Sequence, residues 1–206
     1  MIVIIDNGHG ANTKGKRSPD GLLREAIWAR ETAYALFKAL QARGVDACMI
    51  TPEMQDVLLQ TRVARINKLC RERGAKNCLL VSLHLNASGN GTTWQDARGF
   101  SAFVCKTASR RSKRFAELLT REAEARDLMG NRAMPKRDED GNRFWTWSWT
   151  DKDIYILKKS GCPAVLTESG FMDNKADYAM LQSDAGRERI VAMHVEAIMQ
   201  YLRLCG

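Results

Sequence analysis

The sequence of 206 residues predicts a single-domain α/β fold with three layers, in which a mostly parallel central sheet of about six strands carries helices on both faces. Two patterns predict this class. Short apolar runs alternate with long amphipathic segments, which is the order in which parallel strands and their crossover helices follow one another. The short runs are almost continuously apolar, as is typical of strands buried on both faces.

The expected strands are the apolar runs at residues 2–5, 47–50, 78–83, 100–105, 154–157 and 164–167. A first helix is expected over 25–43 and a second over 57–73, because each segment has helical spacing and is followed by a glycine. Ser109 can cap a third helix. The last helix is expected over 185–204, and His194 within it is interpreted as a partly buried structural histidine.

Composition narrows the classes of function. With 45% hydrophobic and 27% charged residues the chain is typical of a globular protein, and no apolar run of about eighteen residues predicts a transmembrane helix. No basic leader precedes the first strand, so we expect cytoplasmic synthesis without a signal peptide, unless a leader has been removed. Six cysteines without a C-x-x-C pair are expected to be reduced thiols. The net charge of +8 is scattered and accompanies no nucleic-acid-binding motif, which argues against a specific nucleic-acid site.

Three of the expected strands end at side chains that can bind a metal or move a proton. His9 follows the first strand in the stretch DNGHG, His84 follows the strand at 78–83, and Glu168 follows the strand at 164–167. In open parallel sheets, ligands bind beyond the carboxyl ends of the strands, where the loops converge. We therefore expect these three side chains to meet at one edge of the sheet.

Two imidazoles at this edge predict a catalytic zinc site, which needs about three protein N or O ligands and one position for water. Glu25 is the best third ligand, because it lies at the start of the first helix, where the helix dipole favours a carboxylate. Glu31 and Asp6 are its rivals, and Asp6 also suits a hydrogen bond to a ligating imidazole. Glu168 is then available to accept a proton from water and return it to a leaving amine.

Four stretches resemble the zinc-dependent N-acetylmuramoyl-L-alanine amidases of the amidase-3 type, in that family's order and over nearly the whole chain. They are DNGHG, LREAIWARETA, SLHLNAS and PAVLTESGFMDN. The resemblance implies one zinc ion per chain, held by His9, Glu25 and His84, with Glu168 as the catalytic glutamate. It also implies that the substrate is the amide bond between N-acetylmuramic acid and L-alanine in peptidoglycan.

The chain departs from many relatives in two respects. A Thr-Arg pair that is common after their second strand is replaced by Ile50-Thr51-Pro52, and no separate wall-binding module is visible. This pattern is similar to compact phage or prophage lysins and to small amidases that are made inside the cell and reach the wall through another factor. We therefore expect a lysin or an autolysin that acts on the cell wall after release or export. Two other interpretations are a zinc peptidase that cuts within the peptide stem and a non-catalytic wall-binding domain.

Two further groups of residues each have two interpretations. Trp145, Trp147 and Trp149 lie in an irregular, aromatic-rich excursion at about 130–153 within the single domain 1–206. Their period-two spacing places three indoles on one face of an extended segment, which suits either a sugar-binding platform or a small core of the excursion itself. Asn86 and Asn174 flank the expected site, where each can orient a loop or contact the peptide.

Overall fold

The computed structural model describes residues 1–131 and 154–205 in full, and the backbone of residues 135–137 and 143–147. Within these ranges the strands are β1 (Ile2–Asn7), β2 (Ala47–Met49), β3 (Cys78–Asn86), β4 (Ser101–Phe103), β5 (Pro135–Arg137), β6 (Arg143–Trp147) and β7 (Ala164–Phe171). The helices are α1 (Glu25–Gln41), α2 (Leu59–Arg73), α3 (Arg110–Ala125), α4 (Tyr155–Lys159), α5 (Lys175–Gln182) and α6 (Asp184–Cys205), with a 3₁₀ turn at Ala75–Asn77. None of the helices in these ranges is long and apolar enough to cross a lipid bilayer.

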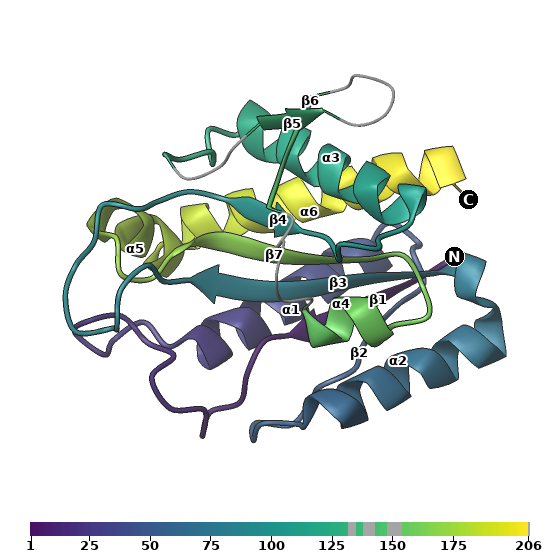
Figure 1. Ribbon diagram of the computed structural model, residues 1–206, viewed down its shortest axis with the longest axis horizontal. Helices are drawn as coiled ribbons and strands as arrows, with labels where there is room; N and C mark the ends of the chain where they lie inside the picture. The colour runs from purple at the N-terminus through teal and green to yellow at the C-terminus, as the bar shows by residue number, and fades with distance from the viewer. Residues whose placement is uncertain (132–134, 138–142, 148–153, 206) are drawn as a thin grey trace.

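The seven strands form one sheet in the order β2-β1-β3-β7-β4-β6-β5. The pairings β1–β2, β1–β3, β3–β7 and β4–β6 are parallel, whereas β4–β7 and β5–β6 are antiparallel. The expected α/β fold with a mostly parallel sheet is therefore confirmed. In Figure 1 both chain termini lie at the end of the sheet opposite the arrowhead of β3, so the carboxyl ends of β3 and of the strands parallel to it, β1, β2 and β7, face away from them.

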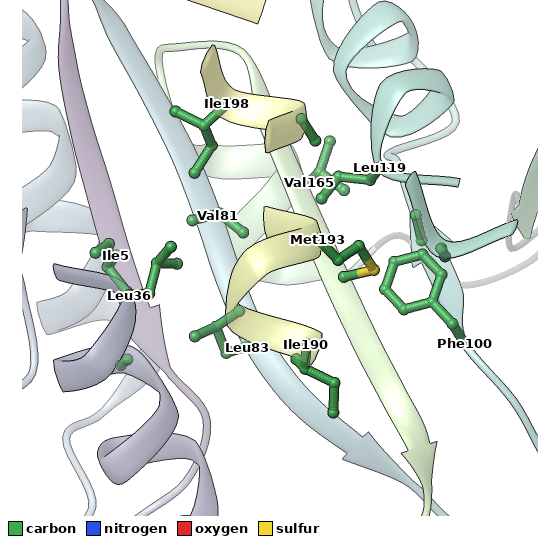
Figure 2. Close-up of a cluster of buried hydrophobic side chains, with 14 of the residues drawn as sticks. Ile5, Leu36, Val81, Leu83, Phe100, Leu119, Val165, Ile190, Met193 and Ile198 are labelled. Atoms are coloured by element: carbon green, nitrogen blue, oxygen red, sulfur yellow. The ribbon is translucent and has the colours of Figure 1, made fainter. Parts of the chain in front are cut away.

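Helices cover both faces of the sheet, as expected. Val3 and Ile5 of β1 point into a core formed with α1, α3 and α6, whereas Ile2 and Ile4 point to the opposite face, into a core formed with α2 and α4. This alternation follows from the period of two along a strand. Figure 2 shows α6 lying across β3 and β7, with apolar side chains filling the space between them: Val81, Leu83, Val165, Ile190, Met193 and Ile198. The six cysteines are free thiols, as predicted.

The structure corrects three expectations about the elements. The run at 154–157, predicted as a strand, belongs to helix α4, in which Ile156 and Leu157 are buried against α2. Periodicity cannot distinguish so short an apolar run from one buried turn of helix. Helix α5 and strand β5 were not expected. The strands β3 and β7 also continue beyond their apolar runs, so His84 and Glu168 lie within strands rather than on the loops that follow.

His194 of α6 is hydrogen-bonded to Thr167 of β7, the residue before Glu168. Its imidazole is fully buried, with Nδ1 2.9 Å from the carbonyl oxygen of Ile190 and Nε2 3.0 Å from Oγ1 of Thr167. A carbonyl oxygen only accepts, so Nδ1 carries the proton and Nε2 accepts from the hydroxyl. Burial lowers the pKa of His194 to about 4, and the hydrogen bond to Ile190 only partly opposes this. The structural role predicted for His194 is confirmed, but the side chain is fully rather than partly buried.

The low pKa of His194 predicts acid destabilisation. The unfolded chain has an ordinary histidine pKa of about 6.5 and therefore binds the proton first as the pH falls, so stability is lost between about pH 6.5 and pH 4. Denaturant unfolding at pH 7 and pH 4.5 should show that the wild-type protein loses about 2 to 3 kcal/mol more than the His194→Gln variant. Parallel pH dependences for the two proteins would contradict this assignment.

Candidate metal centre and active site

His9 lies on the loop immediately after β1, where the backbone has an unusual conformation. The amide of Gly8 donates to the carbonyl oxygen of Leu83 at 2.9 Å, which attaches the loop to β3. His9 has a φ of 57°, in the left-handed region that a few per cent of residues other than glycine adopt, with asparagine, aspartate and histidine the most frequent among them. Such a conformation persists only where surrounding contacts enforce it, and it is typical of functional sites.

The two glycines that flank His9 are required by close contacts. A Cβ atom on Gly8 would collide with the imidazole of His84, and a Cβ atom on Gly10 would collide with the backbone of Gln55 and Asp56. The first glycine therefore lets His84 approach the loop, and the second lets the segment after β2 pack against it. The backbone of the DNGHG stretch is therefore in close contact with β3 on one side and with the segment after β2 on the other.

Two arginines hold the carbonyl oxygen of His9. Arg30 of α1 donates to it from Nη1 at 3.0 Å, and Arg62 of α2 donates to it from Nη2 at 3.3 Å. Arg30 also donates to the carbonyl oxygen of Glu53, from Nε at 3.0 Å and from Nη2 at 2.5 Å. Since α1 and α2 cover opposite faces of the sheet, this arginine clamp connects both helical layers to the His9 loop.

Asp6 supports Arg62 rather than an imidazole, which corrects its expected role. Its Oδ1 accepts a hydrogen bond from Arg62 Nη1 at 2.8 Å and its Oδ2 accepts one from Ser82 Oγ at 2.5 Å. Both Asp6 and Arg62 are buried. The reason is strand register: Asp6 lies opposite Ser82, two residues before His84 on the same face of the sheet, where Arg62 of α2 and Ser82 meet its oxygens. Its contribution to His9 is therefore indirect, through the arginine.

Glu25 is the first residue of α1, and its buried carboxylate lies between the two histidines. Oε1 is 2.9 Å from His84 Nδ1 and accepts a hydrogen bond from the amide of Leu85 at 3.1 Å. Oε2 is 3.5 Å from His9 Nε2, and this buried oxygen has no hydrogen-bond partner. Burial raises the pKa of Glu25, but His84 and then His9 lower it further, so the net shift is downward.

The three side chains form a group that can hold a metal ion. One ligand atom each from His9, Glu25 and His84 lie within 4.8 Å of one another, and the two imidazole rings are 5.1 Å apart at 87°. Burial lowers the pKa of His9 to about 4, which keeps its imidazole neutral, as a metal ligand must be. Two imidazole nitrogens, one carboxylate and an unpaired buried Oε2 fit zinc, which prefers N and O donors in catalytic sites.

Glu168 lies next to this group because β3 and β7 pair in parallel. His84 and Glu168 are register partners, so their side chains emerge from the same face of adjacent strands. Oε2 of Glu168 is buried without a hydrogen-bond partner. Burial raises the pKa of Glu168 to about 8; Glu25 adds to this rise, while His84 and Lys16 oppose it. A carboxyl group with a free oxygen and a pKa near neutrality suits proton transfer.

A cavity of about 650 Å³ opens onto these residues and is lined by all four of them. Phe103 and Leu166 contribute apolar side chains to its wall, and residues 85–91 form its rim together with Gly15 and Lys16. Asn86 lines the cavity, and its Oδ1 accepts a hydrogen bond from the amide of Ala87 at 2.9 Å. The chemical groups and a space for substrate therefore coincide.

The remaining predicted residues lie elsewhere. Asn174 is the N-cap of α5, since its Oδ1 accepts from the amides of Ala176 and Asp177, and its Nδ2 donates to the carbonyl oxygen of Gln95 at 2.9 Å. Of its two interpretations the structure supports the orientation of a loop. Glu31 pairs with Arg187 on the surface at 2.9 Å.

Two of the three tryptophans fall within the described residues. Trp145 and Trp147 belong to strand β6, which confirms that this segment is extended. Trp149 lies outside the described residues. The choice between a sugar-binding platform and a small core therefore stays a hypothesis.

Sequence reasoning missed Arg30, Arg62 and Lys16. The two arginines lie on helices remote from DNGHG in sequence, and no local pattern pairs a guanidinium with a carbonyl 21 or 53 residues away. The sequence contained one sign of the role of Arg62. It lies on the apolar stripe of an amphipathic helix, where a charged side chain requires a buried partner. Lys16 lies in a polar loop whose course over the site becomes visible only in the folded chain.

Comparison with known proteins agrees with this architecture. The structure matches an N-acetylmuramoyl-L-alanine amidase from Clostridium difficile 630 with a TM-score of 0.81 and 22% identity, covering 100% of this chain and 98% of that one. The sequence is 23% identical to the endolysin of Bacillus phage SPP1 over 98% of this chain and 66% of that protein. It is 27% identical to the N-acetylmuramoyl-L-alanine amidase CwlM of Bacillus licheniformis over 98% of this chain and 69% of that protein.

The chain thus spans about two thirds of these two relatives, and it spans 36% of an uncharacterised cell wall amidase of Bacillus anthracis. Residues 3–200 match the family model described as N-acetylmuramoyl-L-alanine amidase. This match covers nearly the whole chain and confirms the resemblance seen in the four sequence stretches. The chain therefore belongs to the amidase-3 family of N-acetylmuramoyl-L-alanine amidases.

Proposed function

We propose that this chain hydrolyses the amide bond between N-acetylmuramic acid and L-alanine in peptidoglycan, with one zinc ion held by His9, Glu25 and His84. One observation carries the proposal. Three metal-binding groups from separate parts of the chain meet beside Glu168, which lines a cavity of about 650 Å³ and has one carboxyl oxygen without a hydrogen-bond partner. Family membership supports the choice of bond.

Each side chain then has a distinct task. A bound zinc ion supplies a Lewis acid that polarises the scissile carbonyl and makes water more acidic near neutral pH. Glu168 accepts the proton that water loses as its oxygen bonds to the carbonyl carbon. As the C–N bond breaks, Glu168 passes that proton to the departing alanine nitrogen. Arg30 and Arg62 act indirectly, because they hold the loop that presents His9.

We propose that residues 1–206 form one catalytic domain. Two apolar cores share a single sheet, and the family match covers almost the whole chain. Cell-wall enzymes and a phage endolysin among the relatives support action on the wall, as a lysin or an autolysin. Peptidoglycan is then its partner.

Digestion of purified peptidoglycan, followed by mass spectrometry of the products, tests the proposed bond. The expected products are intact stem peptides that begin with free L-alanine. The Glu168→Gln variant should lose about 10²-fold or more of the rate, because no group then accepts the proton. The matched control is Glu31→Gln, which removes a surface carboxylate of the same type. Products cut inside the stem would establish the rival zinc peptidase, and no products at all would favour a wall-binding domain.

Zinc content separates the ligands from the other titratable residues. After loading and dialysis, wild-type protein and Glu168→Gln should retain about one zinc per chain, and His9→Ala or His84→Ala should retain little, because two ligands hold the ion weakly. His194→Gln is the matched control, since it alters the third histidine of the chain without touching the site. Elemental analysis measures the outcome. Full zinc in His84→Ala would exclude the proposed ligand set.

The arginine clamp predicts an effect on metal affinity. Arg30→Met removes a donor to the His9 carbonyl without leaving a buried charge unpaired, so the fold should persist while zinc affinity falls about 10-fold. Arg65→Met is the control, because Arg65 contacts Ile50 and Glu53 in the neighbouring segment but not His9. Competition with a fluorescent chelator measures both affinities. Equal affinities in the two variants would show that the clamp does not position His9.

A further inference from the structure

The loop between β1 and α1 places one cationic side chain at the rim of the active-site cavity. Lys16 lines this cavity together with His9, Glu25, His84 and Glu168, and its side chain is exposed. Its ammonium group has no ion-pair partner among the residues that the structure describes.

The backbone of Lys16 is fixed although its ammonium group is free. The carbonyl oxygen of Lys16 accepts a hydrogen bond from the amide of Glu25 at 3.0 Å, and Arg17 and Arg24 form a β-bridge beside it. The base of the side chain is therefore tied to the first residue of α1, next to the metal-binding group. Only the flexible methylene stem and the charged end can move within the cavity mouth.

The described part of the chain places no carboxylate within ion-pair distance of this ammonium group. The carboxylate of Glu25 is buried between the two histidines, and that of Glu168 forms no ion pair with Lys16. A lysine also repels a divalent cation, so it contributes nothing to holding a metal. An exposed, flexible cation suits recognition of an anionic group on the bound substrate better than stabilisation of the reacting centre, which requires a group held in place.

The substrate implied by the proposed function carries such an anion close to the scissile bond. In the peptide stem, the residue after L-alanine is a glutamate linked through its side-chain carboxyl group, so its α-carboxyl group is left over. That group is either a free carboxylate or a neutral amide. It lies one residue beyond the alanine, about 4 Å further along the chain between consecutive Cα positions.

We propose that Lys16 is a specificity-determining residue that binds the free α-carboxylate of the second stem residue and so favours it over the amidated form. This inference rests on the proposed function. It concerns substrate selection and leaves the bond that is cleaved unchanged. The ion pair is partly solvated, so the preference is modest and weakens as salt screens the charges.

The test compares two muramoyl-peptides that differ only in a free or an amidated α-carboxyl group at the second residue. Wild-type enzyme should favour the free acid about fivefold in kcat/KM, mainly through KM, the size typical of one exposed ion pair. Lys16→Met should remove the preference, Lys16→Arg should retain it, and Lys16→Glu should favour the amide. The preference of the wild-type enzyme should shrink in high salt.

Lys14→Met is the matched control, because Lys14 is an exposed lysine of the same loop that does not line the cavity. It should keep the wild-type preference. The inference is overturned if the wild-type enzyme does not discriminate, if Lys16→Met loses both substrates equally, or if only kcat changes. An enzyme that cleaves both peptides without preference contradicts the inference alone, whereas one that cleaves neither contradicts the proposed function as well.

Discussion

The site depends on one buried carboxylate placed between two imidazoles. Burying the charge of Glu25 is strongly unfavourable unless other groups compensate it, and among the described residues its oxygens contact His84, His9 and the backbone amide of Leu85. Since Glu25 is also the first residue of α1, the position of this helix and that of the site cannot be separated. A divalent cation would satisfy the remaining oxygen and allow both histidines to stay neutral. We therefore interpret the three side chains as a metal-binding group rather than as a contribution to the stability of the fold.

Different parts of the fold hold His84, Glu168 and His9 in place. His84 and Glu168 are held by strand register, the most rigid arrangement available, with α6 packed across their strands and His194 hydrogen-bonded to the residue before Glu168. His9 lies on a loop and adopts a left-handed backbone, so it needs the arginine clamp from both helical layers. Asp6 completes this support by neutralising the buried guanidinium of Arg62.

Sequence patterns predicted the fold class because local periodicity determines it, and they predicted the meeting of His9, His84 and Glu168 because a general rule of parallel sheets applies to them. Apolar runs and helical spacing locate the strands and helices, and the carboxyl-end rule for parallel strands brings His9, His84 and Glu168 to one edge. The rules failed for the run at 154–157, because a short apolar run fits a strand and a turn of helix equally well. They also failed where a side chain has a hydrogen-bond partner that no rule connects to it. The hydrogen bond from Arg62 to the His9 carbonyl spans 53 residues. The expected bond from Asp6 to an imidazole was wrong because Arg62 and Ser82 take both carboxylate oxygens of Asp6, which lies opposite Ser82, two residues before His84.

The central claim is that His9, Glu25 and His84 hold the metal, while the six thiols of the chain do not. X-ray absorption at the zinc edge of the loaded protein tests this most directly, because it reports the donor atoms themselves. If these three residues hold the ion, the spectrum should contain only N and O donors at about 2.0 to 2.1 Å, with the multiple scattering that two imidazoles produce. A sulfur shell at about 2.3 Å, or a spectrum without imidazole scattering, would contradict it.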